Sequence, residues 1–492
     1  MVSSAFRQRA ESGVLFNRPA ARRGFAQRFS KAAATDEAVR PDAKEPVTTG
    51  VQRGAHKVAF AGLWLFTLLL YLRPNELFPD LFGHFPIVRY TAIVTLLAYF
   101  ASKLMRGERL MSWPIEMKAL AMIVLLGVLF TPVAESPQDS LTMLLDTFLK
   151  VVTIFVLLIN LIDSPERLRS IIRLVVVLGT IIGVAAIRSY LVGDFSVTDK
   201  GVGVRIAGLV GGIFGNPNDL ATGLDLLLPL AIVLALTSRG LVRLLWLSCA
   251  ALMFAGVIVT FSRGGFLGLL ATGAVLLWKF GGRHRSIITA GVLLTFVLLV
   301  FTLPGQYGNR MRSIINIQQD PTGSAQARRE LLVRAADLAS RHLIFGVGMG
   351  NYHIYSLHEK AAHNSWLEIS TELGLAGLLA YVVLIVAPIR SLRRIERETT
   401  ERAEANDDER RQIHRLSVCL QAVLAAYIVC STFGSIQYLW FLYYPVAYAV
   451  ALRGIHAAWR QTVTHSTADE TAGGRWRSRR NRQGERAVLM QV

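Results

Sequence analysis

Residues 241–261 read LVRLLWLSCAALMFAGVIVTF, an apolar stretch in which Arg243 carries the one charge. A run of this length forms a helix that can cross about 30 Å of hydrocarbon, where only helices and closed barrels satisfy their backbone groups. Working outward from this stretch, we find about twelve such runs. They lie at approximately 57–72, 87–104, 116–133, 141–162, 168–192, 219–237, 241–261, 264–280, 286–303, 366–389, 416–434 and 437–453. The sequence therefore predicts an all-α polytopic membrane protein.

Composition agrees with this fold class and argues against a nucleic-acid partner. Hydrophobic residues make up 52% of the 492 residues, and the net charge is +19. The basic residues gather in the tails and in alternate loops, without aromatic interleaving or a recognition motif, so membrane topology explains the charge better than nucleic-acid binding does. Cys249, Cys419 and Cys430 lie in apolar stretches without metal-binding spacing, so we expect small buried side chains and no metal site.

The distribution of lysine and arginine orients the spans. Basic residues recur in both tails and in one set of alternate connections, at about 103–118, 167–173, 239–243, 279–285 and 390–415. Cytoplasmic loops carry such an excess, so this set and both termini are predicted to face the cytoplasm. The other set would then lie outside, at 73–86, 134–140, 193–218, 262–264, 304–365 and a turn near 435.

Three parts of the chain follow from this reading. Residues 1–56 are expected to form a disordered basic cytoplasmic tail, although their composition also resembles a mitochondrial presequence. Residues 57–455 form the membrane domain, with a large periplasmic loop at 304–365 between spans nine and ten and a charged cytoplasmic loop at 390–415. Residues 456–492 form a second basic cytoplasmic tail. Long loops in compact membrane proteins are often functional.

The first polar cluster on the outer side combines Arg205 with Gly215-Asn216-Pro217-Asn218-Asp219. Asn216 and Asn218 stand where a helix would begin, and helix N-termini attract anions through their free N–H groups and dipole. Ordinary N-capping explains the same residues equally well. This cluster is therefore a candidate anion site.

The second cluster is the very short turn Ser262-Arg263-Gly264-Gly265 between two spans. An arginine at the membrane boundary is costly, so Arg263 calls for a partner or a substrate. The simpler alternative is a cation that snorkels to the interface. Inside the span at 141–162, Asp146 and Lys150 stand four residues apart and are expected to neutralise each other.

The third cluster is His363-Asn364-Ser365, directly before a span that contains Glu368 and Glu372. The two carboxylates lie one helical turn apart on one face. Nearby carboxylates raise the basicity of an imidazole and orient it, so His363 is a candidate general base. A histidine at a helix start is, taken alone, more often a cap or a surface residue.

These clusters together suit a lipid diphosphate as substrate. Guanidinium groups can hold a diphosphate and stabilise it as it leaves, while a neutral imidazole takes a proton from a sugar hydroxyl. The sequence lacks the P-loop, the Rossmann glycine pattern, the GxSxG elbow and the HExxH motif. An activated lipid-linked donor carries its own leaving group, so neither a cofactor nor a metal is expected.

The order of these motifs resembles the O-antigen ligase/polymerase superfamily of bacterial membrane glycosyltransferases. The resemblance rests on Arg205 with the 215–218 motif, on the 262–265 motif, and on the stretch from Gly346-Val-Gly-Met-Gly350 into the span after His363. In the ligases a histidine is followed by Asn, Ser or Gln, nine residues, and Gly-x-x-Gly. Here Asn364 is followed by nine residues, then Gly374 and Gly377.

The resemblance implies a bacterial inner-membrane enzyme with about twelve spans and a large periplasmic loop. It would transfer or polymerise glycan from an undecaprenyl-diphosphate-linked oligosaccharide onto a glycan or lipid acceptor, in O-antigen, lipopolysaccharide or exopolysaccharide assembly. Membrane lipids and polysaccharide-assembly proteins would be its further partners. The implied catalytic residues are His363, Arg263 and Arg205. Those expected to bind substrate are Asn216, Asn218, Arg328, Arg329, Asn364 and Glu368.

One departure keeps ligase and polymerase both open. The second glycine of the ligase pattern is usually followed by threonine, and here Leu378 takes that place. A transporter of a small solute such as bicarbonate, or of a lipid-linked sugar, is the main alternative from another class. Transporters are expected to show internal repeats and interrupted helices near the middle of the membrane. A non-catalytic scaffold for polysaccharide export is the third reading.

Overall fold

The structure, a computed structural model, describes residues 56–78, 80, 87–194, 196–197, 204–206, 214–302, 324–356, 360–401 and 408–463. This part of the chain is helical apart from one antiparallel pair of two-residue strands, β1 (Ser196–Val197) and β2 (Val204–Arg205). Both predicted tails, apart from their ends next to the membrane domain, lie outside the described residues. So does much of the predicted loop at 304–365.

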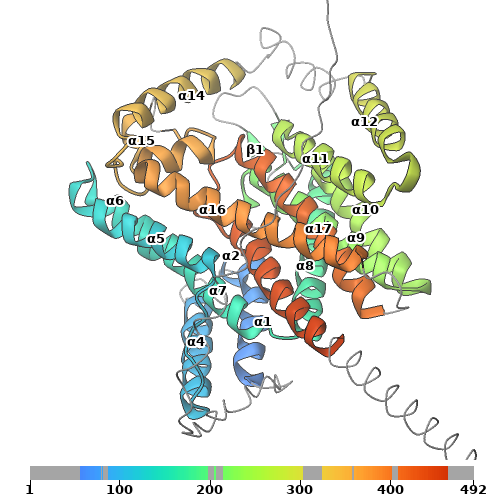
Figure 1. Cartoon of the computed structure of the whole chain (residues 1–492). Coiled ribbons are helices and arrows are strands. Elements are labelled where there is room, and N and C mark those ends of the chain that lie inside the picture. Colours follow the sequence, from blue (N-terminus) through green and yellow to red (C-terminus); the bar gives the residue numbers. More distant parts are fainter. Residues whose placement is uncertain are drawn as a thin grey trace, which may run out of the picture. The chain divides into compact units, whose positions relative to one another are not determined.

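The helices follow the predicted apolar runs closely (Figure 1). They are α1 (Lys57–Leu72), α2 (Pro74–Leu77), α4 (Ile87–Met105), α5 (Ile115–Phe130), α6 (Pro137–Thr142), the π-helix η2 (Met143–Phe148), α7 (Leu149–Leu161), α8 (Pro165–Val192), α9 (Pro217–Thr237), α10 (Gly240–Val259), α11 (Arg263–Phe280), α12 (Arg285–Thr302), α14 (Ser324–Arg341), α15 (Tyr352–Tyr355), α16 (Ser365–Glu401) and α17 (Asp408–Ser431). Short 3-10 turns lie at Thr131–Val133 and Gly282–His284. A last helix covers 440–463.

Eight helical segments of the described chain are long and apolar enough to cross a membrane, which makes this a polytopic membrane protein. The remaining predicted spans also lie on helices, and α1 is a shorter apolar helix of 16 residues. The predicted span at 141–162 begins earlier, at Pro137, and passes through α6, η2 and α7. The helical class is therefore confirmed, while twelve as the number of crossings stays a prediction.

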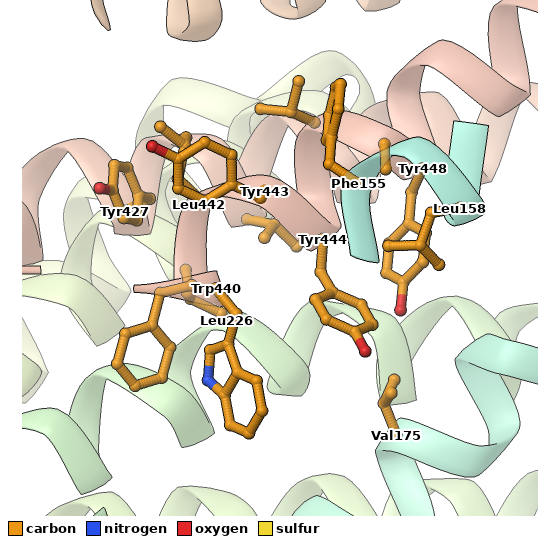
Figure 2. Packing of buried hydrophobic residues seen from close by; sticks show 14 of the residues in the cluster. Phe155, Leu158, Val175, Leu226, Tyr427, Trp440, Leu442, Tyr443, Tyr444 and Tyr448 are labelled. Carbon is orange, nitrogen blue, oxygen red and sulfur yellow. The ribbon is translucent and has the colours of Figure 1, made fainter. Parts of the chain in front are cut away.

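Aromatic side chains fill the centre of the bundle. Figure 2 shows Tyr443, Tyr444 and Tyr448 of the last helix packed among residues of α7, α8 and α9. Their rings meet edge to face, as between Tyr444 and Tyr448 at 5.9 Å, an arrangement that the ring quadrupole favours. The buried hydroxyl of Tyr444 lies 3.1 Å from Thr67 Oγ1 of α1. Large rings therefore fill the space between α9 and the last helix, and one hydrogen bond joins the last helix to α1.

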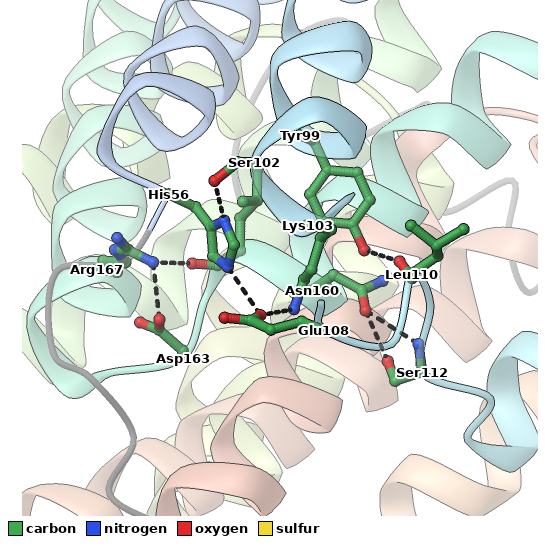
Figure 3. A network of polar contacts seen from close by, with 11 residues as sticks. His56, Tyr99, Ser102, Lys103, Glu108, Leu110, Ser112, Asn160, Asp163 and Arg167 are labelled. Atoms are coloured by element: carbon green, nitrogen blue, oxygen red, sulfur yellow. Dashed lines mark hydrogen bonds and ion pairs between the residues drawn. The ribbon is translucent and has the colours of Figure 1, made fainter. Parts of the chain in front are cut away.

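Polar contacts at one end of the bundle join the loops predicted to be cytoplasmic. Figure 3 shows His56 between Ser102 Oγ at 2.5 Å and Glu108 Oε2 at 3.1 Å, with Lys103 Nζ 2.7 Å from the same carboxylate. The first turn of α5 is tied to the last helix in the same way, since Arg453 donates two hydrogen bonds, of 2.8 and 2.9 Å, to the buried Glu116 carboxylate.

The loops predicted to be external contact one another at the opposite end. Asn351, in the long loop, accepts from Ser136 N at 2.8 Å and donates to Ser140 Oγ at 2.8 Å, which links it to the 134–140 turn. The turns near 218, 262, 363 and 435 also meet, as described below. Described loops of each predicted set thus contact members of the same set. Which end faces the cytoplasm stays a prediction.

Candidate active site

Two of the predicted polar clusters meet where α9 and α11 begin. Asn216 is the N-cap of α9, and its side chain accepts a hydrogen bond from Asn218 N at 2.9 Å. Asn218 in turn accepts from the hydroxyl of Ser262 at 2.9 Å. Ser262 caps α11 by accepting from Gly265 N at 3.2 Å. Both asparagines therefore build the helix starts, and they place Arg263 beside the first turn of α9.

Backbone geometry and small residues set the position of Arg263. Phe261 adopts φ 54°, a left-handed conformation that is uncommon outside glycine, and Arg263 follows as the half-buried first residue of α11. A Cβ on Gly264 would lie 3.0 Å from Phe433 Cβ, and one on Gly265 would lie 2.5 Å from Ala221 Cβ. The two glycines therefore let α11 approach α9 and the turn after α17.

That turn, residues 431–437, joins the arginine cluster to the histidine cluster. Ser365 Oγ donates to Gly434 O at 2.7 Å and accepts from Ile436 N at 2.9 Å. Two residues before Ser365, His363 N donates to Ser435 Oγ of the same turn at 3.1 Å. Because Phe433 also contacts Gly264, the same turn touches both the start of α11 and the start of α16.

His363 sits in a strained position at the entrance to α16. Its φ is 52°, and its side chain is half-buried. Asn364 caps the helix, since its side-chain oxygen accepts from Trp366 N and Leu367 N, both at 3.0 Å. Its amide donates to Thr432 O at 3.3 Å. Non-glycine residues held at positive φ cluster at functional sites, where surrounding contacts enforce them.

The two predicted carboxylates of α16 are buried and hold loops in place. Glu368 accepts from Gln437 Nε2 at 3.1 Å and from Ala362 N at 3.4 Å. Glu372 accepts from Tyr352 N at 3.2 Å. Glu368 therefore ties the residue before His363 to the 431–437 turn, and Glu372 ties α15 to α16. These contacts give both carboxylates a positioning role.

α16 is interrupted at Gly374, two residues after Glu372. Gly374 has φ 65° and ψ −168°, so Leu375 N turns outward and donates to Leu343 O at 2.8 Å. The carbonyls left open at Thr371 and Glu372 accept from Val347 N and Gly348 N, both at 3.0 Å. Every helix break must satisfy its backbone groups elsewhere. Here the Gly-rich segment 343–348 does so, which explains both glycine motifs together.

The long predicted loop covers this end through α14 and α15. Tyr352 is buried and its hydroxyl donates to Leu331 O at 3.1 Å, which ties α14 to α15. Burial raises the pKa of this phenol, so it stays a neutral donor. Figure 1 shows α14 beside the start of α16. Arg329 of α14 is exposed, whereas the side chains of Arg328 and Arg205 lie outside the described part.

The structure thus brings most of the predicted site residues to one end of the bundle. Asn216, Asn218, Arg263, His363, Asn364 and Glu368 all lie at one end and are connected through hydrogen bonds or close packing. The sequence predicted only a short turn near 435, whereas residues 431–437 contact both the start of α11 and the start of α16. The run Ser431-Thr432-Phe433-Gly434-Ser435 between two apolar spans was the available signal. Among the described residues, no group of histidine, cysteine and carboxylate side chains could hold a metal ion.

This arrangement can hold an anion and move a proton at one membrane boundary. A guanidinium at the first turn of α11 adds its charge to the free N–H groups of that helix start. A half-buried imidazole lies on the neighbouring segment, joined to Arg263 through one turn. Anionic leaving-group stabilisation and general-base catalysis need these two kinds of group.

Comparison with known protein families gives a match in the middle of the chain. Residues 248–382 match the family model described as O-antigen ligase, which confirms the resemblance to the O-antigen ligase/polymerase superfamily. This range contains the motif at 262–265, α14, the Gly-rich segment, His363 and the interruption of α16. No curated protein matches the chain.

Proposed function

We propose that this chain, whose residues 248–382 match the family model described as O-antigen ligase, is a membrane glycosyltransferase with a lipid-diphosphate-linked glycan donor. The donor we propose is an undecaprenyl-diphosphate-linked oligosaccharide, and the acceptor is another lipid-linked glycan or a glycolipid. The reaction would take place at the periplasmic face of a bacterial inner membrane. The product would be O-antigen or another exported polysaccharide.

One observation carries this proposal: the Arg263 and His363 motifs lie against the same short turn. Phe433 of that turn packs on Gly264, next to Arg263, and Ser435 binds the backbone of His363 at 3.1 Å. Residues about a hundred positions apart in sequence therefore border one region at a membrane boundary. A lipid-linked sugar presents its diphosphate and its reacting carbon at that depth.

The roles we propose follow from the charge that develops in the reaction. His363 takes the proton from an acceptor hydroxyl, whose oxygen then bonds to the anomeric carbon of the donor. The bond from that carbon to the diphosphate breaks, and the electron pair leaves with the diphosphate. Arg263 and Arg205 would stabilise that anion, with Arg328 or Arg329 above it in the long loop.

The remaining predicted residues would shape the site. Asn216 and Asn218 hold the starts of α9 and α11, while Asn364 and Glu368 hold the His363 segment. Contact of these four side chains with substrate stays a prediction. Their hydrogen bonds show what each would lose on substitution, namely the position of Arg263 or of His363.

A transfer assay with matched variants tests the proposal. The purified protein is given a fluorescent undecaprenyl-diphosphate oligosaccharide, and transferred or lengthened glycan is measured. His363→Asn removes the base but suits a left-handed backbone, so it separates chemistry from folding. We expect His363→Asn to lower the rate by about 100-fold or more, and Arg263→Gln similarly.

Arg394→Gln is the control, because this arginine is 73% exposed and pairs with Glu398 in the same helix turn, far along α16. Its rate should equal that of the unchanged protein. Transfer that continues at full rate in both His363→Asn and Arg263→Gln would contradict the proposal. The surface glycan of a deletion strain separates the subclasses: single repeats still attached indicate a polymerase, and intact polymer on the lipid carrier indicates a ligase.

A transporter remains the second candidate because of the interruption at Gly374. Helices broken within the membrane line substrate sites in many transporters. Solute flux into proteoliposomes without any glycan donor would favour transport. Flux that is absent while glycan transfer proceeds would favour the enzyme.

A further inference from the structure

A cavity of about 690 Å³ lies between α1, α4 and the helical segment Pro137–Leu161. None of its described lining residues belongs to the candidate active site. The cavity is large enough for part of a lipid molecule. Its lining residues are of two kinds. One kind is charged, and the other is apolar.

The charged lining is cationic in excess. Arg73, Arg89 and Lys150 line the cavity together with one acid, Asp146. Arg89 Nη2 lies 3.2 Å from Asp146 Oδ1, so the ion pair of Asp146 reaches across to α4. The sequence predicted that Asp146 would neutralise Lys150 of its own helix, and the structure adds Arg89 of α4 as a partner of Asp146. Among the lining residues, the basic side chains thus outnumber the acidic ones by three to one.

The apolar lining comes from α1, α4 and the segment Pro137–Leu161. Phe66, Leu96 and Leu149 are among these residues. α4 has only 11% of its most apolar window buried inside the protein, so it is the most exposed of the candidate spans. Exposed charges are costly at such a helix unless they meet a counter-charge. Arg89 and Asp146 are each 58% exposed, so this rim is accessible from outside the bundle.

The charges are placed toward the same end as the candidate active site. α1 starts at His56, in the network of the opposite end, and Arg73 follows its last residue. Arg89 is the third residue of α4. Asp146 and Lys150 lie nine and thirteen residues into the segment from Pro137, about 13 and 20 Å along it. The charged lining therefore runs from the end that holds the candidate site to about the middle of this segment.

A π-helix separates the cavity from the candidate site. In η2, Phe148 packs its ring against Tyr438 and Tyr443 at 5.4 and 5.8 Å, toward the 431–437 turn. Asp146 of the same short helix lines the cavity. Single π-helical turns are rare and occur frequently at functional sites. The π-helix thus presents Asp146 to the cavity and Phe148 to aromatic side chains next to the 431–437 turn.

We propose that this cavity binds a lipid with an anionic, phosphate-bearing head group, distinct from the donor held at Arg263. The phosphate would lie among Arg73, Arg89 and Lys150, and the hydrocarbon chain would lie along Phe66 and Leu96. Two sources share this chemistry, an anionic phospholipid and a polyprenyl phosphate. The site does not depend on the proposed glycosyl transfer.

Native mass spectrometry of the full-length protein in detergent tests the proposal. The probes are phosphatidylglycerol, undecaprenyl phosphate and zwitterionic phosphatidylethanolamine. We expect both anionic lipids to bind more tightly than phosphatidylethanolamine. A preference for undecaprenyl phosphate would assign the site to a polyprenyl chain, and equal binding would assign it to anionic phospholipid. Equal retention of all three lipids would overturn the proposal.

Variants localise the binding to the cavity. The double variant Arg73→Gln/Lys150→Met should weaken binding of the anionic lipids by about tenfold or more, since each basic residue near such a head group contributes to binding. Asp146→Asn removes the opposing charge and should strengthen binding, a result that misfolding would not produce. Arg394→Gln is the control and should bind like the unchanged protein.

The outcome is separate from that of the transfer assay. His363→Asn should retain lipid binding in this cavity even when transfer is lost. Unchanged affinity in both the double variant and Asp146→Asn would refute the site, whatever the protein catalyses.

Discussion

Gly346→Ala should detach the Gly-rich segment from α16. A Cβ on Gly346 would lie 2.0 Å from Glu372 O, 2.3 Å from Glu372 C and 2.5 Å from Leu373 N. All three are backbone atoms, which cannot rotate away as a flexible side chain would. Relief of the overlap requires the two segments to separate by about 1 Å, which lengthens their hydrogen bonds beyond bonding distance.

The cost follows from the three backbone hydrogen bonds in that contact. Leu375 N to Leu343 O, Val347 N to Thr371 O, and Gly348 N to Glu372 O measure 2.8, 3.0 and 3.0 Å. At about 1 kcal/mol each, their loss lowers the free energy of unfolding by about 3 kcal/mol. Titration with SDS in mixed micelles, followed by tryptophan fluorescence, measures this difference.

Gly273→Ala is the matched control. A Cβ at Gly273 meets nothing within 4 Å, and the residue lies inside α11. Alanine is the better helix former, so this variant should be more stable by about 0.5–1 kcal/mol. If Gly346→Ala were as stable as the unchanged protein, the Gly-rich segment would not be docked into the interrupted helix. The explanation of both glycine motifs would then be wrong.

Three further predictions concern other contacts. Ser365→Ala leaves a half-buried carbonyl and a buried N–H of the 431–437 turn without their partner, so it should cost about 2–3 kcal/mol in the same titration; a loss under about 0.5 kcal/mol would contradict the contact. Glu116→Gln should cost about 1–2 kcal/mol because Arg453 loses its bidentate partner, and a double-mutant cycle with Arg453→Gln should show coupling rather than additivity. The pKa of Glu108 is lowered from 4.5 by its hydrogen bond to Lys103, so its stabilising contribution is present above pH 4.5 and is lost as pH falls through the folded-state value. Glu108→Gln should therefore be less stable than the unchanged protein at neutral pH, and this difference in the free energy of unfolding should shrink on acidification. Parallel pH profiles of the two proteins would exclude this role.

Apolar periodicity predicted the helices well because a membrane restricts the possible structures. In lipid every backbone group must be satisfied within a helix, so apolar runs such as 219–237 translate directly into elements such as α9. Loop charge divided the connections into two sets, and described loops of the same set contact one another, as Lys279 and Glu396 do, while their placement across the membrane stays a prediction. The interruption of α16 was not predicted from the apolar run at 366–389. Only the contact of Gly374 with Leu343 and Ile344 carbonyls explains it, and that contact joins distant segments.

The candidate site was predictable as a set of motifs but not as a geometry. Arg263 and His363 stood out because charged or titratable groups are costly at a membrane boundary. Asn364 and Glu368 were expected to bind substrate, and the structure shows them capping α16 and holding Gln437. Whether a buried side chain binds substrate or supports a loop depends on its neighbours in space. Sequence spacing does not report those neighbours.

Photocrosslinking of the donor tests the central claim most directly. A photoreactive residue replaces Phe433, which packs on Gly264 and is 37% exposed. The comparison position is Leu241, 85% exposed at the start of α10, near the opposite end. We predict that a radiolabelled undecaprenyl-diphosphate oligosaccharide crosslinks at 433, that unlabelled donor competes, and that Arg263→Gln weakens the signal. Equal labelling at 433 and 241, or labelling that excess donor leaves unchanged, would contradict a donor site where these motifs meet.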